Sequence, residues 1–159
     1  MRFFEDLKVG QRRELGSYTF TADEIKRFAR QFDPQRFHLD EEEGRNSLFG
    51  GLAASGWHVG SIYMKLIVAD NQRLAEIARS RGEPVAVGGP SPGFRELRWL
   101  KPVLAGDTIT FSSEVDSLRA SASRPQWGIL QARNTGINQR GELVFSVLAS
   151  AFVPRRNNG

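Results

Sequence analysis

An aspartate and a histidine lie five positions apart in the stretch QFDPQRFHLD, residues 31–40. An ionised aspartate such as Asp33 accepts protons, and histidine, present here as His38, is the side chain that titrates nearest neutral pH. On a continuous helix a spacing of five would place the two side chains on different faces. Pro34 lies between them and disfavours helical geometry at Asp33. The chain can therefore bend so that both groups point at one place, as a proton-transfer pair requires.

Both residues also have simpler interpretations. Asp33 could cap the turn at the end of a helix, and His38 could be a loop histidine with a local hydrogen bond. The acids at 40–43, DEEE, raise the question of a metal site with His38. Four consecutive acids point in several directions around a helix, so we interpret them as a solvated helix start and expect no metal ion.

A first helix is predicted to lead into Asp33. Thr21 and Glu24 fit the S/T-x-x-E pattern of a capping box. An apolar stripe at helical spacing follows: Ile25, Phe28, Ala29 and Phe32. Because Pro34 disfavours helical geometry at the residue before it, this helix is expected to end at Asp33.

The longest helix is predicted at 54–69, where GGLAASGWHVGSIYMKLIVAD is apolar on most sides, as a core helix would be. His58 within it is interpreted as a packing residue. A separate amphipathic helical piece is predicted at 71–82. Five segments have the composition of strands, namely 84–89, 94–103, 107–118, 127–138 and 142–153.

Helices that come early and strands that come late indicate an α+β fold, with an antiparallel sheet and one long helix buried on it. The length of 159 residues fits one domain over 1–159, with a frayed tail at 153–159. The apolar-rich stretch at 52–68 is interrupted by polar residues, which favours a buried helix over a membrane span.

Composition excludes several classes of site. The chain has no cysteine, so it offers no disulfide, thiolate nucleophile or zinc–sulfur site. The net charge of +4 comes mainly from scattered arginines interspersed with acids, so no nucleic-acid partner is expected. The amino terminus does not have the pattern of a signal peptide, and together with the lack of cysteine this leads us to expect a cytoplasmic protein.

The pattern of Asp33, His38 and Asp40, followed by FGGLAASGWH, resembles the MaoC-like dehydratases and (R)-specific enoyl-CoA hydratases. FRELRWLKPVLAGDT and NQRGELVFS resemble later strands and turns of the same family, and the resemblance covers about residues 3–153. It implies the hotdog fold, in which a long antiparallel sheet wraps around one central helix. It also implies a homodimer that acts on acyl thioesters of coenzyme A, with the acyl tunnel near the subunit interface.

The resemblance further implies a reaction, the reversible addition of water across the double bond of a 2-enoyl-CoA thioester. Asp33 and His38 would be the catalytic pair, bridged by one water, and the Gly56 amide would hold the negative charge on the thioester oxygen. Coenzyme A would belong to the substrate, and no cofactor would be needed. Further expected substrate contacts are Ser55, Trp57, Phe37 and Arg98.

Arg95, Arg98 and Lys101 are candidates for the phosphates of coenzyme A, but on a regular strand Arg95 and Arg98 would face opposite sides. Two alternatives to hydration stay open: a hotdog acyl-CoA thioesterase and a non-catalytic acyl-CoA-binding module. The Asp33 and His38 pair argues against the thioesterase, because hydrolysis requires no proton transfer to carbon.

Overall fold

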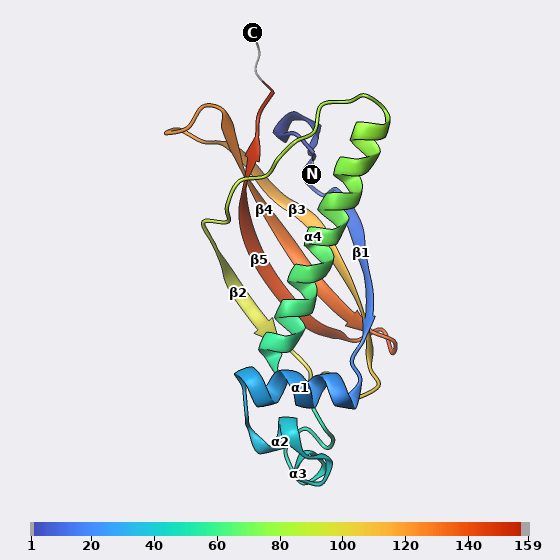
Figure 1. Ribbon diagram of the computed structural model, residues 1–159. Helices are drawn as coiled ribbons and strands as arrows, with labels where there is room; N and C mark the ends of the chain where they lie inside the picture. The colour runs from blue at the N-terminus through green and yellow to red at the C-terminus, as the bar shows by residue number, and fades with distance from the viewer. Residues whose placement is uncertain (1, 157–159) are drawn as a thin grey trace.

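The computed structural model describes residues 2–156 and shows a curved sheet around one long helix (Figure 1). In chain order the elements are η1 (Phe4–Asp6), β1 (Arg12–Thr19), α1 (Ala22–Phe32), α2 (Arg36–Leu39), α3 (Glu41–Arg45), α4 (Gly56–Ser80), β2 (Gly93–Trp99), β3 (Thr108–Ala120), β4 (Trp127–Asn138) and β5 (Leu143–Pro154). The three short helices α1, α2 and α3 gather at the amino end of α4.

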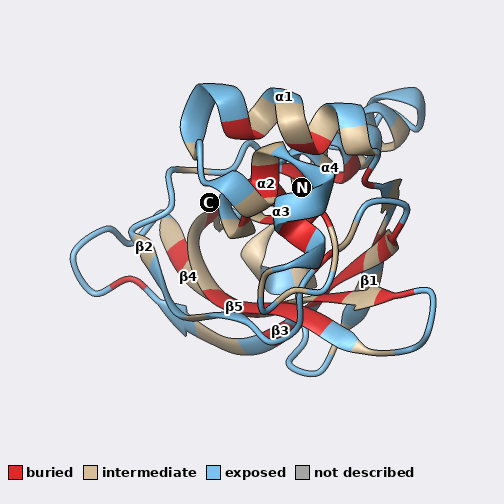
Figure 2. Cartoon of the chain, turned by 90° about the horizontal axis from the view of Figure 1, so that it is seen from below, coloured by how far each residue is buried: buried red, intermediate tan, exposed pale blue. Residues whose placement is uncertain are grey.

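The five strands form one sheet in the order β1-β3-β4-β5-β2, and all neighbouring pairs are antiparallel. The core lies between α4 and the face of the sheet that curves around it (Figure 2). Tyr63 of α4 packs there against Phe145 and Phe111, with ring centroids 5.5 and 6.5 Å away. The predicted α+β fold, with one antiparallel sheet around one long central helix, is confirmed.

The number of strands was predicted correctly, but one strand was misplaced. β1 has the sequence RRELGSYT, in which charged and polar side chains hide the strand signal, and its pairing with β3 is shifted between Glu14 and Gly16. Residues 84–89 do not form a strand. This segment includes Pro84, which has no N–H to donate to a ladder, and its contact with β5 includes a single hydrogen bond from the Gly89 amide to Phe152.

The two helical pieces predicted at 54–69 and 71–82 are one continuous helix, α4, of 25 residues. Asp70 and Asn71 lie at the junction of the two predicted pieces. Asp70 is buried but paired with two arginines, Arg13 and Arg73, so the helix continues through it. The helix ends where Gly82 adopts a left-handed φ of 67° and the next amide, that of Glu83, returns to the carbonyl of Ala78.

The carboxyl-terminal segment is ordered further than expected. β5 continues to Pro154, and Arg155 and Arg156 form ion pairs with Glu5 and Asp6. The prediction of a frayed tail is therefore wrong for 153–156, while its remainder, 157–159, lies outside the described residues. Within residues 2–156, no helix is both long enough and apolar enough to cross a membrane.

Candidate active site

Helix α1 delivers Asp33 to the amino end of α4. The Thr21 hydroxyl accepts a hydrogen bond from the Glu24 amide and donates one to the Glu24 carboxylate, so the predicted cap is confirmed. The last helical residue is Phe32, and Asp33 leaves helical geometry with φ −154° and ψ 68°. Pro34 thus ends the helix as predicted, and the chain turns into α2, which carries His38.

The carboxylate of Asp33 and the imidazole of His38 face each other, with Oδ2 3.5 Å from Nε2. The Nδ1–H of His38 donates to the Ala53 carbonyl at 2.7 Å. This bond fixes the ring orientation and leaves Nε2 directed at the carboxylate. The other oxygen of Asp33, Oδ1, accepts a hydrogen bond from the Gln35 side-chain amide at 2.8 Å.

Asp33 is held in its ionised form. Partial burial of the carboxylate raises its pKa, but hydrogen bonds from the side chains of Ser55 and Gln35, together with the nearby His38, outweigh burial, so the net pKa is lowered. The Asp33 side chain is only 19% exposed and that of His38 only 6%, so bulk water does not screen the pair strongly. The site therefore combines a carboxylate that accepts protons with an imidazole directed toward it.

The amino end of α4 supplies hydrogen-bond donors beside this pair. Ser55 is the N-cap, and its hydroxyl accepts from the Trp57 amide at 3.2 Å. No residue in the range 2–156 accepts a hydrogen bond from the amide of Gly56, the first helical residue. Amides at a helix start carry partial positive charge, so this N–H can stabilise an oxyanion.

Glycine is required at position 56 because the Trp99 ring lies against it. A Cβ placed there would lie 2.4 Å from a Trp99 ring carbon. The indole N–H of Trp99 donates to the Gly56 carbonyl at 2.9 Å. Trp99, at the end of β2, therefore fixes the first turn of α4 and closes one side of the site.

A pocket of about 570 Å³ opens onto these groups. Its wall includes five of the predicted catalytic and substrate-binding residues: Asp33, Phe37, His38, Gly56 and Trp57. Most of the remaining wall is apolar, from Phe49, Trp99 and Leu100, and Lys101 contributes a cation. A mostly apolar pocket with a few converging polar groups is the usual form of a small-molecule site.

Two predicted substrate residues are not on this wall. Ser55 is buried beneath it, and its hydroxyl contacts Asp33 and the Trp57 amide. Arg98 lies on β2, outside the set of residues that line the pocket. The structure therefore does not bring Ser55 and Arg98 to the pocket surface.

The expectation that Arg95 and Arg98 face opposite sides is wrong. Arg95 pairs with Leu148 and Arg98 pairs with Ser146. The two arginines are three residues apart on β2, whereas their partners are only two residues apart on β5. Glu96 takes up the extra residue with a positive φ of 55°. Leu148 and Ser146 are two residues apart and lie on one face, so both arginines lie on that face as well.

Three contributors to the site were not predicted. Gln35 follows Asp33 by two residues, a spacing typical of a local side-chain bond, and that signal was available. The Ala53 carbonyl and the Trp99 ring had no signal in the sequence, because each reaches the site through the tertiary fold.

Two other predictions about nearby residues are confirmed. His58 is a packing residue, stacked on Phe28 with ring centroids 4.6 Å apart and edge-on to Phe20 at 5.1 Å. Asp40 begins a helix, α3, by accepting hydrogen bonds from the amides of Glu42 and Glu43.

Comparison with known proteins gives the relatives of this chain. Its sequence matches the MaoC like domain over residues 6–126. The solved MaoC-like dehydratase from Rhodospirillum rubrum is 38% identical with a TM-score of 0.79, and the match covers 98% of this chain and 99% of that one. RV0216 of Mycobacterium tuberculosis, which has a double hotdog fold, is 22% identical with a TM-score of 0.77, over 99% of this chain and 46% of that one.

A shorter match concerns an enzyme with a named substrate. Mesaconyl-CoA hydratase from Cereibacter sphaeroides is 38% identical over 65 residues, which are 41% of this chain and 19% of that protein. Together with the double hotdog structure of RV0216, the element order and sheet confirm the hotdog fold predicted for this chain.

Proposed function

Because the chain belongs to the MaoC-like dehydratase family, matched over residues 6–126, we propose that it adds water reversibly across the double bond of a 2-enoyl-CoA thioester. The observation that carries the proposal is the meeting of Asp33, His38 and the Gly56 amide around one pocket. Each group matches one requirement of hydration, which needs a proton acceptor, a proton donor and a site for negative charge.

The reacting water contacts both Asp33 and Nε2 of His38 from the pocket side in this proposal. Ionised Asp33 takes a proton from the water as its oxygen bonds to the β carbon, and protonated His38 gives a proton to the α carbon. The proton then returns from Asp33 to His38 across the 3.5 Å gap, which restores the starting state. The product gains one water, and the enzyme gains no net proton.

The electron pair of the double bond moves toward the thioester carbonyl when the water oxygen attacks. The Gly56 amide stabilises the resulting enolate oxygen, aided by the positive end of the α4 dipole. Removing one such donor typically lowers the rate about 10²–10³-fold. The aromatic walls from Phe37 and Trp57 hold the acyl group and exclude bulk water.

We assign Ser55 a supporting role in place of the direct substrate contact expected from the sequence. Its hydroxyl bonds to Asp33 and so keeps that carboxylate ionised and oriented. Lys101, on the pocket wall, is better placed than Arg98 to meet a phosphate of coenzyme A. No cofactor takes part in this scheme.

A second copy of the chain is proposed to cover β2 and the adjoining face of α4. β2 is an edge strand, and exposed apolar side chains gather near it, including Trp57, Met64, Phe94 and Trp99. A cavity of about 280 Å³ lies between this strand and α4. Exposed apolar surface along an unpaired strand favours association, and light scattering would measure it.

Crotonyl-CoA tests the reaction. We expect loss of the enoyl absorbance without release of free thiol, because hydration leaves the thioester bond intact. Release of thiol would instead identify a thioesterase. No reaction with enoyl-CoA substrates of several chain lengths would contradict the proposal and favour a binding module.

A further inference from the structure

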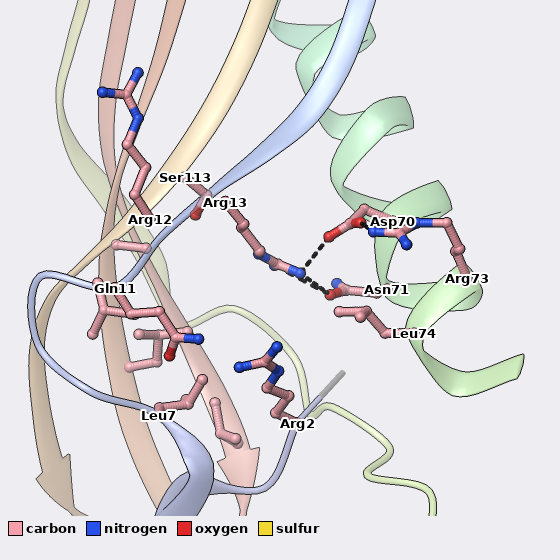
Figure 3. Close-up of a pocket in the computed structure, with 14 residues that line it drawn as sticks. Arg2, Leu7, Gln11, Arg12, Arg13, Asp70, Asn71, Arg73, Leu74 and Ser113 are labelled. Atoms are coloured by element: carbon pink, nitrogen blue, oxygen red, sulfur yellow. Dashed lines mark hydrogen bonds and ion pairs between the residues drawn. The ribbon is translucent and has the colours of Figure 1, made fainter. Parts of the chain in front are cut away.

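A second cavity, of about 160 Å³, lies at the other half of α4 (Figure 3). It is lined by the residues around Asp70 on α4, by the start of the chain and by strands β1, β3, β4 and β5. Asp70 follows Gly56 by 14 residues, which is about 21 Å along a helix. The cavity is therefore separate from the pocket of Asp33 and His38.

One wall of this cavity carries more positive than negative charge. Arg13 donates to Asp70 at 2.5 Å, and Arg73 donates to the other oxygen of Asp70 at 2.6 Å. Arg2 also lines the cavity, and within residues 2–156 no carboxylate forms an ion pair with it. Arg2, Arg13 and Arg73 thus bring three positive charges to the cavity against the one negative charge of Asp70, while Arg12 points away and bonds to Ser112.

Arg13 has a lowered pKa in this arrangement, although it donates to both Asp70 and Asn71. Burial lowers its pKa, Asp70 opposes that effect, and the positive charges of Arg2 and Arg73 lower the pKa further. Figure 3 shows the Arg2 guanidinium pointing into the space between Gln11 and Arg13. An anion in that space would offset the repulsion, and guanidinium groups match the geometry of carboxylates.

The rest of the cavity is mostly apolar. Its apolar wall is formed by Leu7, Leu74, Val115, Leu130, Ala132 and Val153. This composition disfavours a fully hydrated inorganic ion and suits a molecule with an apolar body. The cavity is smaller than the roughly 300–1,000 Å³ of sites for drug-sized ligands, so the molecule must be small.

A row of polar side chains extends from the cavity into the core between α4 and the sheet. Arg13, Ser113 and Asn134 stand at the same level on β1, β3 and β4. Ser113 lines the cavity, while Asn134 is fully buried and its Oδ1 has no hydrogen-bond partner within residues 2–156. A core filled only for packing would not be expected to hold this polar row, and it adds polar character to the inner end of the cavity.

We propose that this cavity binds a small carboxylic acid anion with a short apolar body, whose carboxylate lies between Arg2 and Arg13. The apolar part contacts Val115, Leu130 and Ala132. This ligand is independent of the hydration reaction, and its site is formed by a different part of α4.

Hexanoate is the probe, followed through the methyl NMR signals of the whole protein. We expect hexanoate to shift the signals of Leu7, Leu74, Val115, Leu130 and Val153, with half-saturation at or below about 1 mM. Hexanamide has the same apolar body without the charge and should bind at least about tenfold more weakly.

Arg2→Ala is the test variant, because Arg2 is exposed and its loss leaves the Arg13–Asp70 pair in place. It should weaken hexanoate binding about tenfold. Two control variants should leave hexanoate binding unchanged. Arg30→Ala removes the same charge from an exposed position on α1, and Asp33→Asn changes the other pocket.

Three results would overturn the proposal. One is an absence of shifts around the cavity, or shifts confined to Val59 and Val103 of the other pocket. Another is equal binding of hexanoate and hexanamide, and the last is equal weakening by Arg2→Ala and Arg30→Ala.

Discussion

Replacement of Ser55 by alanine tests the arrangement of the catalytic groups most directly. The Ser55 hydroxyl caps α4 by accepting from the Trp57 amide at 3.2 Å, and its interaction with the Asp33 carboxylate lowers the pKa of that group. Loss of an N-cap typically costs about 1 kcal/mol. We therefore expect Ser55→Ala to lower the free energy of unfolding by about 1–2 kcal/mol, measured by urea denaturation.

The same variant should change the pH dependence of activity. Hydration requires ionised Asp33, and the Ser55 bond lowers the pKa of that carboxylate. Without the bond the pKa rises, so the acidic limb of kcat/KM should move to higher pH. If Ser55 acted only as a helix cap, its loss would lower stability but would leave the acidic limb of kcat/KM at the same pH.

Ser61→Ala is the matched control. Ser61 lies on the same helix and its hydroxyl bonds to the Trp57 carbonyl at 2.7 Å, but it is exposed and lines the cavity beside β2 instead of the pocket of Asp33. We expect a stability change within about 0.5 kcal/mol and an unchanged pH profile. If Ser55→Ala and Ser61→Ala gave the same acidic limb, the assignment of Ser55 to Asp33 would be refuted.

Three further substitutions test other parts of the structure. Asp33→Asn should reduce turnover of crotonyl-CoA at least about 10²-fold while circular dichroism stays unchanged, and a wild-type rate would remove Asp33 from the mechanism. Gly56→Ala places a Cβ 2.4 Å from the Trp99 ring and should cost about 1–3 kcal/mol of stability, and the double variant with Trp99→Ala should recover part of that cost. Burial lowers the pKa of His58 from 6.5 to about 4, so the unfolded chain binds the proton more readily below pH 6.5 and the free energy of unfolding decreases as the pH is lowered. Between pH 7 and pH 5 this loss should be about 2 kcal/mol by urea denaturation, and His58→Leu should abolish that part of the pH dependence.

The sequence determined the features that depend on neighbouring residues. The cap at Thr21, the helix end before Pro34 and the bend that turns Asp33 toward His38 all arise within the stretch from 21 to 38. The long apolar helix and four of the five strands were also recognisable, because their periodicity and composition are local. β1 was missed because its charged residues mask the alternation that identifies a strand.

Tertiary structure decided which distant groups complete the site. Ala53 orients His38, Ser55 holds Asp33, and Trp99 covers Gly56 across 43 positions of the chain. The bulge at Glu96 placed Arg95 and Arg98 on one face of the sheet. Such contacts depend on strand register and on how α4 lies against the sheet, and a one-residue change in register moves a side chain to the other face. Local sequence patterns do not contain that information, because many registers satisfy the same alternation of apolar and polar residues.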